Sequence, residues 1–260
     1  MGLPIPAKVF VFWGQSNMVS QGGNSDEVPA DLDRFPERVF IWRVDTQKIV
    51  AYDPGVTSSP ISGFKWGPEA QFAYDYAIAH PGDFVFIMKY AVGGTALAPI
   101  TSDNWLPGSN SLFTEAANNL RSLMATLRIQ GYAPEIKAIF GMQGETDSAD
   151  TQATADAYRA NKINFYQNAL SQWAGEFTNV KFIDGRIGIN NGTYKDTIRN
   201  NQICAAEATS NAFMVDTDDF TSISPGNIHF DGDSLVTLGH RFYQSYMGTY
   251  DDSGLPACDA

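Results

Sequence analysis

Strand-like and helix-like segments alternate along almost the whole chain. The strand-like runs are rich in β-branched and aromatic residues, and several are apolar at nearly every position, as is typical of strands covered on both faces. They lie at residues 8–13, 38–43, 83–90, 135–140, 180–184 and 213–215. Helical patterns lie at residues 69–79, 112–129, 153–173, 195–209 and 234–247. This alternation predicts an α/β protein, a three-layer α/β/α sandwich around a central parallel sheet of about five strands.

Length and composition favour one large globular domain spanning residues 1–260. Of the 260 residues, 43% are hydrophobic and 18% are charged, which excludes the disordered, collagen-like and coiled-coil classes. The Gly, Pro and Ser-rich stretch at 53–68 is interpreted as a long surface loop within that domain.

The charge balance disfavours nucleic acid and anionic membrane surfaces as partners. The chain has 17 Lys plus Arg against 29 Asp plus Glu, and its formal net charge of −12 repels phosphate groups. No apolar run approaches the roughly 18 residues of a membrane-spanning helix. The first residues do not resemble a signal peptide. The abundance of Asn, Ser, Thr and Gly in the second half favours an extracellular, periplasmic or virion-associated setting over a cytoplasmic one.

The two cysteines, Cys204 and Cys258, lack Cys or His neighbours at metal-ligand spacing, so the sequence disfavours a zinc site. A long-range disulfide that ties down the C-terminal tail is one interpretation. Two buried thiols are an equally good one.

Four polar loops follow predicted strands and should meet at one edge of a parallel sheet, where ligands of such sheets bind. They lie at residues 14–18, 93–95, 143–147 and 227–231. A serine nucleophile needs a base to take its proton and donors to hold the oxyanion that forms. Of the three histidines, only His229 lies in a loop just ahead of a predicted helix.

The segment Gly14-Gln15-Ser16-Asn17-Met18 resembles the nucleophile block of the SGNH hydrolases, in the variant typical of carbohydrate O-acetylesterases of the sialate acetylesterase and acetylxylan esterase type. The family's other blocks are matched in the same order. They are Trp66-Gly67-Pro68-Glu69, Gly93-Gly94-Thr95, Gln143-Gly144-Glu145, and Ile228-His229-Phe230 with Gly239 and Arg241 beyond it. The resemblance spans nearly the whole chain and implies a flavodoxin-like fold with no metal or organic cofactor.

The resemblance implies that Ser16 is the nucleophile and His229 the base. It also implies an oxyanion hole made by the main-chain N–H groups of Ser16 and of Gly93 or Gly94, with the side-chain amide of Gln143. Glycine allows a close approach of its N–H to the substrate, and an amide donates without a charge of its own. Gly93 is favoured over Gly94, because the family's block places a Thr or Ser two residues after the glycine.

One position departs from the family's pattern. An Asp commonly stands three residues before the His and orients its imidazole, but this chain has Gly226 there. Two replacements stay open: a loop carboxylate, or a main-chain carbonyl that accepts from Nδ1 in a Ser-His dyad. The candidate carboxylates are Asp216, Asp218, Asp219 and Asp231.

Three further residues, Asn17, Glu145 and Trp66, are candidates for substrate binding. Asn17 either positions the serine loop or lines the pocket. Glu145 and its neighbour Asp147 also suit a structural role that braces the serine loop, because carboxylates beside an oxyanion oppose its charge. Trp66, with Trp105 and Tyr90, either forms a wall on which a sugar stacks or fills the core.

The expected reaction is the hydrolysis of an acetyl ester on a sugar hydroxyl, so an acetylated carbohydrate is the expected substrate. The first alternative is a glycan-binding module derived from such an esterase that has lost turnover with its Asp. The second is a broader short-chain lipase or thioesterase of the same superfamily.

Overall fold

The computed structural model describes residues 3–20, 28–29, 32, 37–58, 61, 63, 65–109 and 112–259. Seven strands within these residues form one sheet in the order β3-β2-β4-β1-β5-β6-β7. Their bounds are β1 (Ile5–Gly14), β2 (Val39–Arg43), β3 (Lys48–Ala51), β4 (Phe84–Ala91), β5 (Tyr132–Met142), β6 (Lys181–Gly185) and β7 (Ala212–Val215). Every neighbouring pair is parallel except β2 and β3, which form an antiparallel hairpin.

The sheet contains the predicted flavodoxin-like arrangement. Taken in chain order, β1, β4, β5, β6 and β7 lie in the spatial order 2-1-3-4-5. The β2–β3 hairpin extends this five-stranded core at its β4 edge. All six predicted strands are confirmed, and β3 is the strand that the sequence did not predict. It has only four residues, and both its ends are exposed, so it lacks the apolar run that marks the others.

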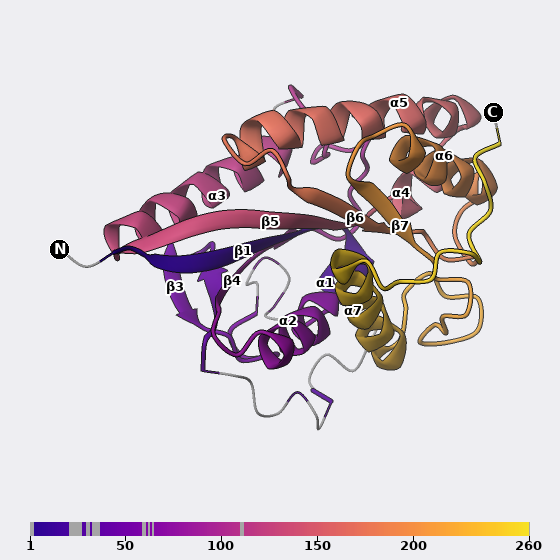
Figure 1. Ribbon diagram of the computed structural model, residues 1–260. Coiled ribbons are helices and arrows are strands. Elements are labelled where there is room, and N and C mark those ends of the chain that lie inside the picture. The colour runs from indigo at the N-terminus through magenta and orange to yellow at the C-terminus, as the bar shows by residue number, and fades with distance from the viewer. Residues whose placement is uncertain are drawn as a thin grey trace.

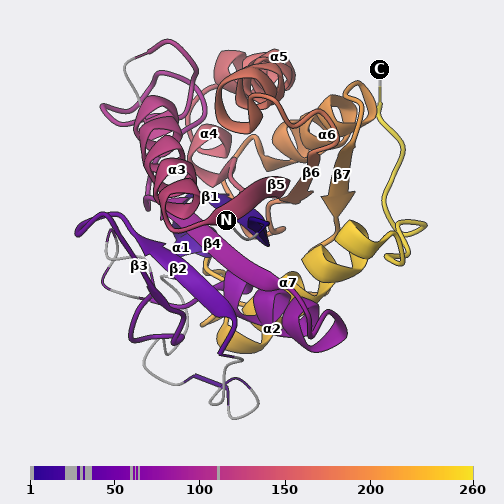
Figure 2. The same cartoon turned by 60° about the vertical axis from the view of Figure 1, so that its left-hand side comes forward.

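Helices cover both faces of the sheet. Figure 1 shows α3, α5 and α6 on one face, and α2 and α7 on the other, and Figure 2 shows α2 and α7 side by side. The five predicted helices are confirmed within a few residues, although the third ends in a π-helical turn, η3. The bounds are α1 (Ser16–Val19), α2 (Pro68–Ala79), α3 (Leu112–Ile129), α4 (Glu145–Ser148), α5 (Gln152–Ala169), η3 (Leu170–Ala174), α6 (Lys195–Glu207) and α7 (Gly232–Met247).

Strand β1 lies in the middle of the core and is buried on both faces. Phe12 stacks on Phe140 of the neighbouring strand, with 4.7 Å between ring centroids, and meets Phe72 of α2 on one face. The next side chain, Trp13, points to the opposite face and stacks on Phe165 of α5 at 3.8 Å. Aromatic packing on both sides therefore fixes the end of β1, the strand that leads into the serine loop.

The block at residues 66–69 fixes the start of α2 through a buried ion pair. Glu69 accepts hydrogen bonds at Oε1 from Lys89 Nζ at 2.8 Å, from the Gly67 N–H at 3.0 Å and from the Tyr52 hydroxyl at 3.0 Å. The Lys89 and Glu69 side chains are 1% and 0% exposed. Removing one partner of such a pair leaves an uncompensated buried charge, at a cost of ~3–5 kcal/mol.

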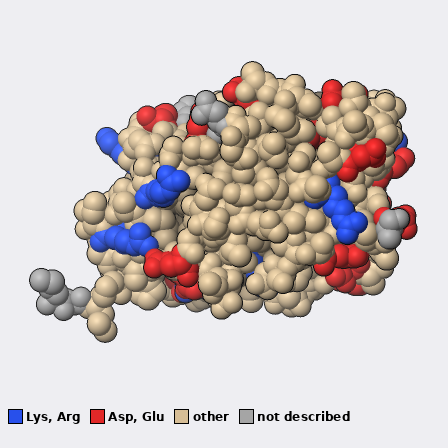
Figure 3. All heavy atoms as spheres, turned by 90° about the horizontal axis from the view of Figure 1, so that it is seen from above, with Lys and Arg blue, Asp and Glu red and all other residues tan. Residues whose placement is uncertain are grey.

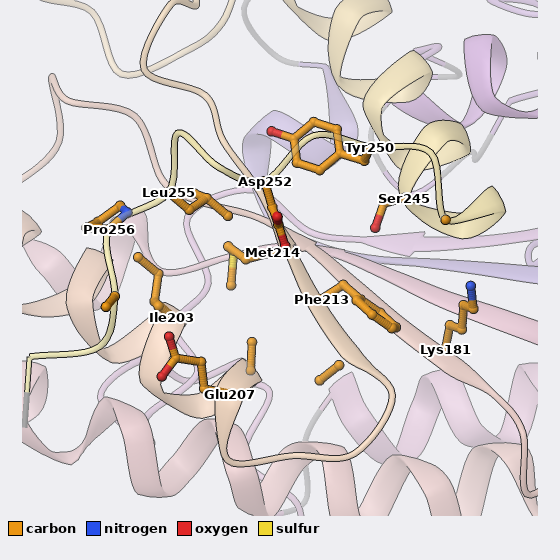
Figure 4. A pocket seen from close by; sticks show the side chains of 14 residues that line it. Lys181, Ile203, Glu207, Phe213, Met214, Ser245, Tyr250, Asp252, Leu255 and Pro256 are labelled. Atoms are coloured by element: carbon orange, nitrogen blue, oxygen red, sulfur yellow. The ribbon is translucent and has the colours of Figure 1, made fainter.

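A disulfide joins Cys204 of α6 to Cys258 of the C-terminal tail. The disulfide interpretation is therefore confirmed over that of two free thiols. The tail passes along the β7 edge and, with α6 and the end of α7, borders an open hollow of about 510 Å³. Figure 4 shows side chains of this hollow, among them Phe213 and Met214 of β7. None of the predicted site residues lines it.

Neither a membrane-spanning helix nor, on the face drawn in Figure 3, a continuous basic patch is found in the parts that the structure describes. Within those residues, no helix is both long enough and apolar enough to span a membrane. On the face drawn in Figure 3, Lys and Arg side chains are few and lie apart, mostly near Asp and Glu.

Candidate active site

The predicted nucleophile, Ser16, lies at the point where β1 ends. Gly14 closes the strand with a φ of +141°, and a Cβ added to it would lie 2.0 Å from the carbonyl oxygen of Met142 on β5. Only glycine fits this contact. The Gln15 N–H then donates to the same Met142 oxygen at 3.0 Å, and Ser16 begins α1. Ser16 therefore lies at the carboxyl edge between β1 and β5, where the strand order reverses.

The four predicted loops meet through hydrogen bonds. The Thr146 N–H donates to Gln15 Oε1 at 3.2 Å, which joins the third loop to the serine loop. The Val92 N–H donates to the Gly14 carbonyl at 3.0 Å, which places the start of the glycine loop beside them. Asn17 connects the serine loop to the histidine loop, as described next. The structure thus brings together four segments that the sequence places far apart.

Asn17 is 1% exposed, and its side chain contacts the main chain on both sides of His229. Its Nδ2 donates to the Ile228 carbonyl at 3.1 Å, and its Oδ1 accepts from the Phe230 N–H at 2.9 Å. The Nδ2 also donates to Glu145 Oε1 at 2.8 Å. Because Asn17 directly follows Ser16, these bonds hold the serine segment and the histidine segment together.

His229 is partly exposed at this junction. Burial lowers the pKa of its imidazole below the ordinary 6.5, and the positive charge of Lys65 lowers it further. A lowered pKa keeps the ring neutral at neutral pH, which is the form that accepts a proton. The main chain of His229 is held as well, because its N–H donates to Asn227 Oδ1 at 2.9 Å.

The acids that the sequence offered as partners of this imidazole bind elsewhere. Asp219 forms a two-pronged ion pair with Arg241, at 2.8 and 2.6 Å. Asp218 pairs with Arg199 and Arg186.

The other two candidates are also engaged. Asp216 lies 3.3 Å from Arg186, and Asp231 caps α7 by accepting from the Ser234 N–H at 2.9 Å. Among the described residues, no carboxylate is hydrogen-bonded to the imidazole of His229. The expectation of an orienting acid at Asp218, Asp219 or Asp231 therefore does not match the hydrogen bonds, because arginines and a helix N-terminus hold these side chains.

Gln143 is 1% exposed, and its amide is held in one orientation. Its Oε1 accepts from the Tyr158 hydroxyl at 2.9 Å, and its Nε2 donates to Asp147 Oδ2 at 2.6 Å. Its main-chain carbonyl accepts from Gln202 Nε2 at 3.0 Å. An amide nitrogen has two hydrogens, so one N–H of Gln143 is left without an acceptor among the described residues.

The main-chain donors expected in the oxyanion hole are also unpaired. Within the described ranges, the N–H groups of Ser16, Gly93 and Gly94 have no hydrogen-bond acceptor. Gly94 has a φ of +73°, a left-handed conformation that favours glycine. Thr95 fixes the turn, because its hydroxyl donates to the Val92 carbonyl at 2.7 Å and accepts from Trp105 Nε1 at 3.0 Å.

Two carboxylates lie buried behind these donors. Burial raises the pKa of Glu145 to about 7, although the hydrogen bond from Asn17 lowers it. Burial also raises the pKa of Asp147, against the hydrogen bonds from Ala98 and Leu97. Each accepts hydrogen bonds from the loops in front of it, so both brace the site.

The aromatic candidates are packed in the interior. Trp66 is 1% exposed, Trp105 is 0% exposed and Tyr90 is 7% exposed. A sugar stacks on an exposed ring face, so the packing of these three rings suits core filling better than a stacking wall. In particular, the substrate-binding role expected of Trp66 does not match its burial.

No cluster of three or more His, Cys, Asp or Glu side chains suited to a metal occurs within the described ranges.

Two residues that hold the site were missed in the sequence. Tyr158 of α5 and Gln202 of α6 are both 0% exposed and both bind Gln143. Gln202 also accepts from the Ile187 N–H at 3.0 Å. The helical pattern could have pointed to these residues, because a Gln on the buried face of a helix needs a polar partner inside the protein.

Comparison with solved structures finds the same fold in other proteins. A protein from Arabidopsis thaliana superposes with a TM-score of 0.77 at 22% identity, over 95% of this chain and 100% of its own. NanS superposes with a TM-score of 0.64 at 13% identity, over 95% and 98%. A carbohydrate acetylesterase from Xanthomonas citri gives a TM-score of 0.66 at 16% identity, over 93% of this chain and 56% of its own.

A search among curated proteins finds no match. The family model described as "Carbohydrate esterase, sialic acid-specific acetylesterase" matches residues 6–248, nearly the whole chain. The protein therefore belongs to this family of carbohydrate acetylesterases, which are carboxylic ester hydrolases.

Proposed function

We propose that the protein removes O-acetyl groups from a carbohydrate by a Ser-His mechanism. The observation that carries this proposal is the junction at Asn17, whose side chain joins the segment that bears Ser16 to the main chain on both sides of His229. The segments that carry a hydroxyl near the start of the chain and an imidazole near its end thus meet at one edge of the sheet, which supports the proposal.

The chemistry proceeds in two rounds. Ser16 Oγ attacks the ester carbonyl carbon while His229 takes the hydroxyl proton. The tetrahedral intermediate collapses as His229 returns that proton to the sugar oxygen. The sugar then leaves, and the acetyl group stays bound to Ser16. Water then attacks the acetyl carbonyl with His229 as base, and acetate is released as the proton returns to Ser16.

The oxyanion that forms in each round is held by the N–H groups of Ser16 and Gly93 and by the free N–H of Gln143. These donors are fixed before substrate binds, so little reorganisation accompanies the reaction. Each is worth ~2.7–4 kcal/mol of transition-state stabilisation. The absence of any carboxylate on the imidazole, within the described residues, favours a Ser-His dyad over a triad.

The substrate is proposed to be an acetyl ester of a sugar hydroxyl. The family membership supports the carbohydrate and the acetyl group. The negative net charge of −12 favours a neutral glycan over a polyanionic one.

The proposal is tested by acetate release from acetylated xylan, sialic acids, pectin and bacterial surface polysaccharide, with the wild type beside Ser16→Ala and His229→Ala. Release from at least one substrate, abolished by Ser16→Ala, is the expected result. Binding of a glycan without turnover by the wild type would instead identify a binding module. Faster hydrolysis of octanoyl than of acetyl esters would identify a lipase or thioesterase.

A further inference from the structure

We infer that Asn17, held by Glu145, is a positioning residue that places the imidazole of His229, in the role that an orienting acid plays elsewhere. This inference rests on the Ser-His mechanism proposed above. It concerns how the base is held, and not which atoms react.

The imidazole has no side-chain hydrogen-bond partner among the described residues, whereas the main chain at and around His229 is hydrogen-bonded. Gly226, where the family has an Asp, has a left-handed φ of +76°. A Cβ built there would have no atom within 4 Å. A side chain at this position would therefore start in open space, with no contact to the His229 ring within 4 Å of its Cβ.

The main chain is hydrogen-bonded by Asn17 immediately before and after the histidine. Asn17 donates to the Ile228 carbonyl and accepts from the Phe230 N–H, so a single amide fixes both peptide units that flank His229. Both functions are needed at once, because one partner is an acceptor and the other is a donor. Asparagine carries a donor and an acceptor on one short, planar group, which an aspartate or a serine cannot replace fully.

Glu145 determines which way this amide faces. The Nδ2 of Asn17 has two hydrogens, and the two acceptors are Glu145 Oε1 and the Ile228 carbonyl. A flipped amide would turn its oxygen toward both acceptors and its nitrogen toward the Phe230 N–H. Glu145 is 3% exposed, so water cannot substitute for it readily.

The test combines steady-state kinetics on p-nitrophenyl acetate with hydrogen exchange of the Phe230 amide. Phe230 is 3% exposed and its N–H donates to Asn17, so exchange of this one proton reports on the hydrogen bond between Asn17 and the histidine segment, without any substrate. For Asn17→Ala we expect a loss of ~10²-fold in kcat, the size of effect that a small misplacement of a reacting group produces, with KM nearly unchanged. The Phe230 amide should lose its protection.

Conservative variants separate positioning from folding. Glu145→Gln keeps an oxygen that accepts from Asn17 and should retain most of kcat, whereas Glu145→Ala should lose more. Asn17→Asp places two acidic groups together and should lose as much as Asn17→Ala. Adding Glu145→Gln to Asn17→Asp should recover part of kcat, because residue 145 can then donate to residue 17.

Asn119→Ala is the matched control. Asn119 also makes three side-chain hydrogen bonds, to Trp42, Gln47 and Glu115, but on α3 and away from the site. It should leave kcat and the Phe230 amide as in the wild type.

Unchanged kcat or unchanged Phe230 protection in Asn17→Ala overturns the inference. If Asn17→Ala does not fold, the comparison of Asn17→Asp with the double variant Asn17→Asp, Glu145→Gln decides. The inference is overturned if the double variant recovers neither kcat nor the protection of the Phe230 amide. A wild type without esterase activity would refute the proposed function and, with it, the positioning role, whatever Phe230 does. Activity lost in Ser16→Ala but unaffected in Asn17→Ala would refute this inference alone.

Discussion

Asp147 accepts a 2.6 Å hydrogen bond from the side-chain amide of Gln143, and the same carboxylate accepts from the N–H groups of Leu97 and Ala98 at 2.8 and 2.9 Å. One buried side chain thus fixes the amide donor of the proposed oxyanion hole and the segment that follows the glycine loop. The donors are aligned by a group that lies behind them.

Removing the amide donor should slow the chemical step. For Gln143→Ala we expect kcat to fall ~10²–10³-fold, the usual effect of losing one oxyanion donor, with a smaller change in KM. Asp147→Asn should also lower kcat, but by less than Gln143→Ala. The new amide nitrogen would face N–H donors, so residue 147 would no longer hold the Gln143 amide in place. Steady-state kinetics on an acetyl ester measures both. A normal kcat in Gln143→Ala would remove Gln143 from the oxyanion hole.

The close approach of β1 and β5 at the serine loop predicts a severe effect of Gly14→Ala. The added Cβ would lie 2.0 Å from the Met142 oxygen, and φ is +141°. Either the strands separate or Ser16 moves, so we expect unfolding at a lower temperature together with loss of activity. Gly82→Ala is the control, because its Cβ would have no atom within 4 Å. Wild-type stability and activity in Gly14→Ala would contradict the packing described for this loop.

Glu145 should make the protein less stable as the pH rises. Its pKa in the folded protein is about 7, raised from 4.5 chiefly by burial. The folded state therefore binds this proton more tightly than the unfolded state. The stabilisation is fully present below about pH 4.5 and is lost as the pH rises through 7, to a total of roughly 3 kcal/mol.

Glu145→Gln removes this titration. The free energy of unfolding of the variant, measured in urea relative to the wild type, should therefore rise by up to roughly 3 kcal/mol between pH 4.5 and pH 8. Asp147 and Lys162 act electrostatically on Glu145 and remain in both proteins, so the comparison isolates residue 145. A difference in stability that does not change with pH would mean that Glu145 has an ordinary pKa.

The disulfide should stabilise the fold without serving the site. It joins residues 54 apart in the sequence, and loop-closure entropy assigns roughly 4 kcal/mol to such a link. We expect Cys258→Ser to unfold at a lower temperature and to retain its kcat at 25 °C. A large loss of kcat in a folded Cys258→Ser protein would show that the tail acts on the site through α6.

The sequence predicted most of what depends on local pattern. Runs such as 8–13 and 83–90 are apolar enough to identify buried strands, and the loops after them carry polar residues that a parallel sheet brings to one edge. The contacts inside the site lie beyond local pattern. Asn17 binds Glu145 across 128 positions and Phe230 across 213, and only the packed sheet sets these pairings.

The same dependence on contacts beyond local pattern explains why the roles of the candidate acids and of the aromatic residues could not be predicted. Asp218 and Asp219 lie close to His229 in sequence, but Arg199 and Arg241 from two helices bind them instead. Trp66 lies in the stretch interpreted as a surface loop, and of its two interpretations, sugar stacking or core filling, its burial favours the second. In both ion pairs the partner comes from another element, 19 and 22 positions away in the chain.

Detection of the acetyl-enzyme tests the account most directly. Rapid mixing with an acetyl ester, quenching in acid and peptide mapping by mass spectrometry should place the acetyl group on Ser16. It should be absent from Ser16→Ala and greatly reduced in His229→Ala. An acetyl group on another residue, or turnover of the ester by Ser16→Ala at the wild-type rate, would contradict the account.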